Sequence, residues 1–128
     1  MDTQLLNKTV LIVEDEVAMS SAMEAKFQKY GFAVLKAGDG EEGYKMAMGN
    51  KPDLLMLDLI MPKMDGISLM KEIRKDAAWG NNVPIIILTN LSDHESMSEA
   101  AENRVYFLVK TEWRLDDVVK LAMEKLGI

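Results

Sequence analysis

Residues 54–66 read LLMLDLIMPKMDG, an apolar run that ends on an acid and continues into a loop with Pro62 and Gly66. The run LLML does not alternate with polar residues, so it predicts a strand covered on both faces, as in a parallel sheet. Asp58 ends the run, where the chain reaches the rim of the sheet and water. Pro62 limits the loop to few conformations, and Gly66 permits a tight or positive-φ turn before a helix.

The same alternation of strand and helix continues on both sides of this stretch. Short apolar runs predict strands at residues 9–13, 32–37, 53–58, 83–88 and 106–109. Apolar residues at helical spacing predict helices at residues 16–30, 41–48, 67–75, 92–103 and 113–126. Asp39 precedes Glu42 at the spacing of a capping box. Ser92 and Glu95 have the same spacing, and Asp65 is a candidate N-cap of the third helix.

Five strand–helix pairs predict an α/β fold with an open, doubly wound sheet of five parallel strands, (βα)5, because a barrel would need eight pairs. We expect the flavodoxin-like strand order 2-1-3-4-5, in which strands one and three are neighbours where the order reverses. Right-handed crossovers then place helices on both faces. The sequence contains eleven methionines, and we expect most of them, such as Met56, Met70 and Met123, to fill the core.

The composition of the 128-residue chain excludes several kinds of site and several cellular locations. The sequence contains no cysteine, which excludes disulfides, zinc–thiolate sites and cysteine catalysis and favours a reducing compartment. The first residues, MDTQLLNKTV, do not resemble a signal peptide, and no apolar run approaches the ~20 residues of a membrane helix. The net charge of -6 argues against direct binding to nucleic acid. We therefore expect a cytoplasmic protein without membrane contact.

Polar side chains occupy the carboxyl ends of four predicted strands. They are Glu14 and Asp15 after strand one, Asp58 at the end of strand three, Thr89 after strand four and Lys110 after strand five. Because parallel strands end at the same edge, we expect the three acids to lie close together. Two carboxylates ~4 Å apart repel by roughly 4 kcal/mol at an effective dielectric of 20, so a cation is required. Oxygen ligands favour Mg²⁺, with Mn²⁺ as a possible substitute.

These side chains together form a receptor for a phosphoryl group. A carboxylate-bound metal, the Thr89 hydroxyl and the Lys110 ammonium would bind phosphoryl oxygens, which leaves Asp58 as the nucleophile. Each residue alone also has a structural explanation, such as helix capping by Asp15 or a strand end at the surface for Asp58. Their joint position at one edge favours phosphoryl chemistry. His94 has no second histidine with which to form a metal site, so we interpret it as a surface residue.

The chain resembles a response-regulator receiver domain, the phosphoacceptor module of two-component signalling. The segments LIVEDE, LMLDLIMPKMDG, ILTN and YFLVK carry the resemblance in this order, within residues 8–126. It implies one receiver domain over residues 1–128 that acts as a phosphorylation-dependent switch. The implied partners are a sensor histidine kinase or histidine phosphotransfer protein and a downstream protein target, with the chain a monomer or a phosphorylation-dependent dimer. Such a domain catalyses its own phosphorylation and dephosphorylation rather than turning over a separate substrate.

The resemblance also implies roles for the acidic residues. Asp58 would accept the phosphoryl group. Asp15, Asp58 and the carbonyl group of Ile60 would hold Mg²⁺, and Glu14 would act through water. The metal site would thus join residues that follow strand one with residues at the end of strand three.

For the switch, the resemblance implies that Thr89 and Lys110 bind phosphoryl oxygens and that the Phe107 ring follows Thr89 when it moves inward. The fourth helix, fifth strand and fifth helix would form the output face. The chain departs from the family pattern at Thr111, where a proline is usual, and at Asn90, where a small residue is usual. ENRVY also replaces the common Gly-Ala before the last strand.

Three other classes of protein share part of this pattern. A flavodoxin-type flavin carrier has the same architecture, but Glu14, Asp15 and Glu16 would repel a flavin phosphate. An acid-phosphatase-like enzyme would need a DxD pattern where this sequence has EDE. A receiver-like interaction module that does not require phosphorylation stays open because of Asn90 and Thr111. Since only Gly127 and Ile128 follow the last predicted helix, we expect a stand-alone regulator or a fragment of a longer protein, without an output domain in this chain.

Overall fold

The computed structural model describes residues 7–89, 104–110 and 113–128 and contains one sheet of five strands in the order β2-β1-β3-β4-β5. The strands are β1 (Thr9–Val13), β2 (Ala33–Ala37), β3 (Leu54–Asp58), β4 (Ile85–Thr89) and β5 (Tyr106–Val109). All neighbouring strands are parallel. The predicted open α/β sheet and its strand order are therefore confirmed.

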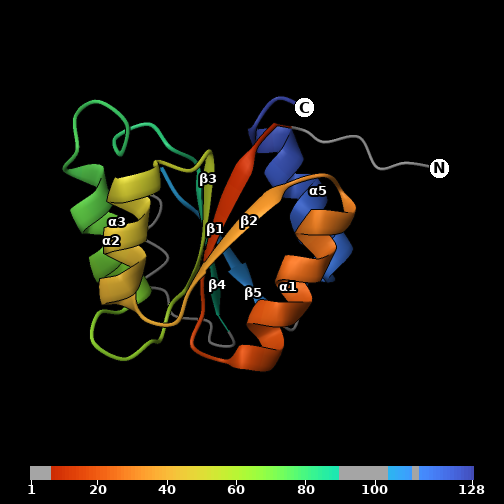
Figure 1. The fold of residues 1–128 in the computed structure, drawn as a ribbon, viewed down its shortest axis with the longest axis horizontal. Coiled ribbons are helices and arrows are strands. Elements are labelled where there is room, and N and C mark those ends of the chain that lie inside the picture. The colour runs from red at the N-terminus through yellow and green to blue at the C-terminus, as the bar shows by residue number, and fades with distance from the viewer. Residues whose placement is uncertain (1–6, 90–103, 111–112) are drawn as a thin grey trace.

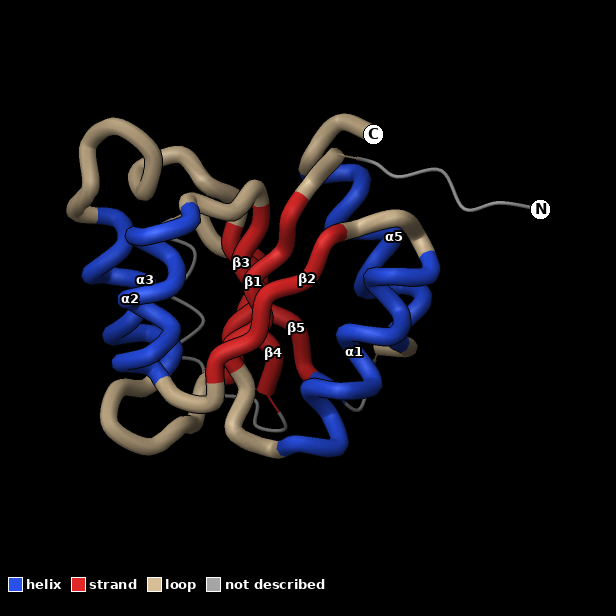
Figure 2. The backbone as a smooth tube through the Cα atoms, viewed as in Figure 1, coloured by secondary structure: helices blue, strands red, loops and turns tan. Residues whose placement is uncertain are grey.

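Helices cover both faces of the sheet (Figure 1). They are α1 (Val17–Lys29), α2 (Gly40–Asn50), α3 (Gly66–Arg74) and α5 (Leu115–Lys125). Figure 2 shows α2 and α3 side by side on one face and α1 and α5 on the other. The helix predicted at residues 92–103, with Ser92, His94 and Glu95, lies outside the described residues. Among the described helices, none has both the length and the apolar character needed to cross a membrane.

The core consists of two apolar layers, one on each face of the sheet. Neighbouring residues of β3 point to opposite layers: Leu55 belongs to the layer beneath α2 and α3, and Met56 to the layer beneath α1 and α5. This two-sided burial explains why the central strands are continuously apolar. The predicted core role of three methionines is confirmed, because Met56 and Met70 are buried and Met123 packs against the second layer.

The first turns of α2 and α3 are stabilised by the predicted aspartates. The Asp39 carboxylate accepts a hydrogen bond from the Glu42 amide at 2.9 Å, and the Asp65 carboxylate accepts one from the Ser68 amide at 2.8 Å. The α2 cap differs from a standard capping box in one respect. The Glu42 carboxylate accepts from the amide of Gly38, not from that of Asp39, at 3.1 Å. Side-chain capping thus defines where both helices begin.

The fourth strand is shifted along the chain relative to its prediction. It was expected at residues 83–88 but spans Ile85–Thr89 in the structure. Pro84 has no amide hydrogen to donate, so only its carbonyl joins the ladder, as the acceptor from the Leu55 amide at 3.0 Å, and the paired register starts at Ile85. Thr89 pairs with Val109 of β5, so it is the last residue of β4 rather than the residue after it, and only 2% of its surface is exposed. At the C-terminal helix, Trp113 lies before α5, which begins at Leu115.

Candidate active site

The carboxyl ends of β1 and β3 bring three acidic side chains to one edge of the sheet. These strands are hydrogen-bonded neighbours, with Val13 opposite Leu57. Glu14 and Asp15 therefore leave the sheet beside Asp58. One carboxylate oxygen from each of the three residues lies within 4.8 Å of the other two. The expected convergence of these acids is confirmed by the structure.

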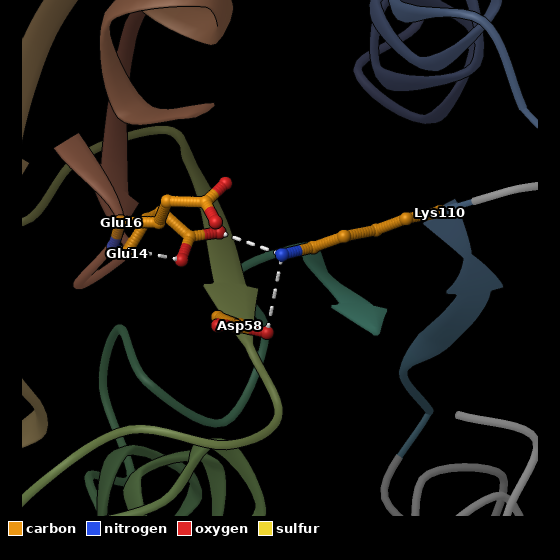
Figure 3. Close-up of polar contacts among 4 residues, drawn as sticks. All are labelled: Glu14, Glu16, Asp58 and Lys110. Atoms are coloured by element: carbon orange, nitrogen blue, oxygen red, sulfur yellow. Dashed lines mark hydrogen bonds and ion pairs between the residues drawn. The ribbon is translucent and has the colours of Figure 1, made fainter. Parts of the chain in front are cut away.

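Lys110 extends from the end of β5 into this acidic group (Figure 3). Its Nζ atom lies 2.9 Å from Glu14 Oε1 and 3.5 Å from Asp58 Oδ1. Only 10% of the Lys110 side chain, 1% of the Glu14 side chain and 11% of the Asp58 side chain are exposed. Lys110 thus reaches the acids although Thr111, and not the usual proline, follows it.

Burial and charge shift the proton equilibria of this pair. Burial raises the pKa of Glu14; the hydrogen bond from Lys110 opposes that shift, and the neighbouring Asp58 carboxylate reinforces it. Burial alone would lower the pKa of Lys110, but the hydrogen bond to Glu14 and the charge of Asp58 outweigh it, so this pKa is raised. Lys110 consequently keeps its proton. One ammonium group then faces three carboxyl groups, and the site retains an excess of acid.

The acids border an open cavity of about 370 Å³. It is lined by Glu14, Asp15, Glu16, Asp58, Ile60, Thr89 and Lys110. The sequence had predicted a site role for all of these residues except Glu16. Phe107 does not line the cavity. It lies in β5 opposite Ile87, is half-buried, and packs against the apolar layer beneath α2 and α3.

Glu16 is the lining residue for which the sequence indicated no role beyond repelling a flavin phosphate. Its backbone amide donates a hydrogen bond to Glu14 Oε2 at 3.2 Å and so helps to orient that carboxylate. The acidic run EDE was the available signal, but it does not reveal a backbone contact. Asn90 and Thr111, which depart from the family pattern, lie outside the described residues.

The donor atoms of the cavity fit a small, hard cation. Glu14, Asp15 and Asp58 offer carboxylate oxygens, and the Ile60 carbonyl belongs to the loop that follows Asp58. Mg²⁺ prefers such oxygen donors and retains several water molecules, for which an open cavity leaves room. The uncompensated acid supplies the electrostatic attraction. The residues present therefore match the chemistry of a magnesium site.

The whole sheet region matches a known family. The family model described as response regulator receiver domain matches residues 10–122. The probable transcriptional regulator ycf27 of Guillardia theta is 43% identical over 84 residues, which are 66% of this chain and 32% of that protein. The alkaline phosphatase synthesis transcriptional regulatory protein PhoP of Bacillus subtilis is 38% identical over 84 residues, or 66% of this chain and 34% of PhoP. The chain spans about a third of the length of these relatives.

Solved structures agree with this match. The receiver domain of the Francisella response regulator 1452 aligns with a TM-score of 0.85 at 29% identity, covering 94% of this chain and 98% of that one. A chain of the CheX-CheY-BeF3-Mg²⁺ complex from Borrelia burgdorferi aligns with a TM-score of 0.82 at 27% identity, covering 91% and 87%. With the family match over most of its length, the chain belongs to the response regulator receiver domains, the phosphoryl-acceptor switches of two-component signalling.

Proposed function

We propose that Asp58 accepts a phosphoryl group from a sensor histidine kinase or a histidine phosphotransfer protein, and that Mg²⁺ is required. The observation that carries this proposal is the position of the Asp58 carboxylate. It lies in one cavity with two further acids, whose oxygens are within 4.8 Å, and 3.5 Å from the ammonium group of Lys110. The site thus combines a nucleophile, a place for a divalent cation and a fixed positive charge.

The chemistry follows from these groups. A carboxylate oxygen of Asp58 attacks the phosphorus of a phosphohistidine, the phosphorus–nitrogen bond breaks, and the imidazole leaves with the bonding electron pair. An acyl phosphate forms on Asp58. The Lys110 ammonium and the Thr89 hydroxyl bind phosphoryl oxygens, where they offset the negative charge of the incoming group. Because Asp58 is consumed until the acyl phosphate hydrolyses, the chain modifies itself and does not turn over a separate substrate.

Asp15, Asp58 and the Ile60 carbonyl would hold Mg²⁺ directly, with Glu14 acting through water. The bound ion would supply charge neutralisation that lets a phosphoryl group approach a cluster of carboxylates. The complex from Borrelia burgdorferi combines a CheY protein with BeF3 and Mg²⁺. Its similarity to this chain supports the same ion here.

The output step uses residues close to this cavity. Thr89 is almost fully buried at the end of β4, and Phe107 lies half-buried on the adjacent strand β5. When Thr89 moves toward the phosphoryl group, the Phe107 ring follows into the space beside it. The surface formed by the predicted helix at 92–103, β5 and α5 would then bind a downstream protein. We propose that the protein acts in the cytoplasm, as one receiver domain, in a monomer or a phosphorylation-dependent dimer.

The test is incubation with Mg²⁺ and acetyl phosphate, followed by intact-mass measurement. Wild-type protein should gain the mass of one phosphoryl group, and Asp58→Asn should gain none. Asp117→Asn, an exposed position of α5, serves as the control for the loss of one acid and should be phosphorylated like wild type. Phosphorylation of Asp58→Asn would contradict the proposed acceptor. Absence of any mass gain on wild type would favour the phosphorylation-independent interaction module.

A further inference from the structure

The loop that follows the proposed acceptor contains a strained turn centred on Lys63. Lys63 has a φ of 71°, and the Met64 amide donates a hydrogen bond to the Pro62 carbonyl at 2.8 Å. A hydrogen bond between residues two apart around a positive φ defines the less common form of γ-turn. A lysine adopts this backbone conformation only at a cost in free energy, which other contacts must offset. Such turns often occur at functional sites.

Contacts with the start of α2 hold this turn in place. A Cβ atom added at Gly40 would lie 2.6 Å from Met64 Cβ and closer still to the Met64 carbonyl oxygen. Only glycine therefore lets the loop backbone approach the first turn of α2 so closely. Lys63 Nζ also lies 3.6 Å from Asp39 Oδ2. This ion pair is the weaker restraint, because 59% of the Lys63 side chain is exposed to solvent.

The other end of the loop is fixed to the sheet. The Leu59 amide donates to the Leu88 carbonyl at 3.1 Å, and the Leu59 carbonyl accepts from the Gly66 amide at 2.8 Å. The residues between Leu59 and Met64 are thus bounded by two anchored points. Ile60, whose carbonyl is the proposed metal ligand, lies in this short interval. The far end of this interval is Met64, the residue that a Cβ atom at Gly40 would displace.

We propose that Gly40 is a positioning residue of the phosphoryl site, which keeps the loop of residues 59–65 in its strained turn and the Ile60 carbonyl beside the acids. This inference rests on the proposed Mg²⁺-dependent function, since Ile60 matters only as a ligand there. A link of this kind would make metal affinity depend on the junction between β2 and α2, outside the cavity. The turn at Lys63 lies between Ile60 and Met64 in the chain and so connects the proposed metal ligand with the residue that Gly40 approaches.

The first experiment compares two glycines of the same helix. Gly40→Ala forces the Met64 backbone to shift, whereas a Cβ atom at Gly49 meets no other atom within 4 Å. Alanine suits a helix at both positions, so the two changes differ mainly in their contact with the loop. Mn²⁺ binding is measured by electron paramagnetic resonance without any phosphodonor, on protein shown to be folded by circular dichroism. Gly40→Ala should bind Mn²⁺ about 10-fold more weakly, and Gly49→Ala as tightly as wild type.

A second pair of variants changes the turn and leaves every residue of α2 as in wild type. Lys63→Pro imposes a negative φ and should weaken Mn²⁺ binding by about 10-fold. Lys63→Gly also removes the ion pair with Asp39 but adopts positive φ without strain, so its affinity should stay at the wild-type level. This pair decides the question if Gly40→Ala does not fold. Unchanged affinity in Lys63→Pro, or in folded Gly40→Ala, overturns the proposal.

The same data separate this inference from the proposed function. If wild type binds Mn²⁺ and is phosphorylated on Asp58 while Gly40→Ala and Lys63→Pro match it, only the positioning role of Gly40 fails. If wild type neither binds Mn²⁺ nor accepts a phosphoryl group, the proposed function fails and this inference fails with it.

Discussion

Lys110 Nζ donates a hydrogen bond to Glu14 Oε1 at 2.9 Å, although 96 positions separate the two residues in the chain. The contact joins the ends of β1 and β5, which lie on opposite sides of β3 and β4 in the sheet. Both side chains are largely buried, so each removes much of the other's cost of leaving water. The Asp58 carboxylate, the proposed phosphoryl acceptor, lies 3.5 Å from the same ammonium group. The pair therefore links stability of the fold to the charge of the site.

Removal of the Lys110 charge should destabilise the protein. In metal-free buffer we expect Lys110→Met to lower the free energy of unfolding by about 3 kcal/mol, because Glu14 and Asp58 lose their cation in a partly buried site. Urea unfolding followed by circular dichroism measures the change. Lys75→Met is the matched control, since it breaks an exposed ion pair with Glu72 and should cost less than about 1 kcal/mol. An equal loss of unfolding free energy in the two variants would show that the buried ion pair stabilises the fold no more than the exposed one.

Divalent cations should stabilise the wild-type protein through Asp15. At ten times its dissociation constant, Mg²⁺ should raise the free energy of unfolding by about 1.4 kcal/mol. Asp15→Asn should lose this gain yet be more stable than wild type in EDTA, because one of three mutually repelling acids is gone. The measurement is urea unfolding at constant ionic strength with and without Mg²⁺. An equal Mg²⁺ effect in both proteins would exclude Asp15 as a ligand.

The backbone after Asp58 should tolerate no side chain at Gly66. A Cβ atom there would lie 3.1 Å from Leu59 Cα and closer still to the Asp58 carbonyl oxygen. We expect Gly66→Ala to lower the free energy of unfolding by about 2 kcal/mol, since backbone atoms cannot move aside cheaply. Thermal unfolding provides the measurement. Gly38→Ala, where a Cβ atom meets nothing within 4 Å, should cost much less.

Acid should destabilise the protein partly through Asp76, remote from the cavity. Its carboxylate accepts hydrogen bonds from the amides of Gly80 at 2.7 Å and Trp79 at 2.8 Å, and these bonds lower its pKa. The pKa of Asp76 is lower in the folded state than its value of about 3.9 in the unfolded state. At pH values between these two pKa values, the unfolded state therefore binds more protons. The contribution of Asp76 is therefore complete above that unfolded pKa and is lost as the pH falls through the folded pKa.

Asp76→Asn tests this assignment. Its urea midpoint should fall less steeply than that of wild type as the pH is lowered from 5 toward 2, about the range in which an aspartate with a depressed pKa titrates. Asp117→Asn, on the exposed surface of α5, is the control for the removal of one acid. Identical slopes for Asp76→Asn and wild type would mean that the two amide bonds do not affect the titration.

Several features of the fold could be predicted because they depend on local patterns. The continuous apolar runs correctly indicated strands buried on both faces, and the cap at Asp65 was visible from its place before a helix. The strand order was expected from the flavodoxin-like topology, and the meeting of Glu14, Asp15 and Asp58 followed from the rule that parallel strands end at one edge of the sheet. The boundaries of β4 were misplaced because an apolar pattern does not show that Pro84 can only accept a ladder hydrogen bond or that Thr89 pairs with Val109.

The residue pattern alone specifies a parallel α/β sheet with acidic residues at one edge. Strands and their ends can be recognised from residues that are adjacent in the sequence. The ion pair of Lys110 with Glu14 and the close approach of Gly40 to Met64 emerge only in three dimensions. Both contacts depend on the relative positions of strands and helices in the packed core. No local pattern encodes that distance, since packing of the whole sheet and its helices sets it.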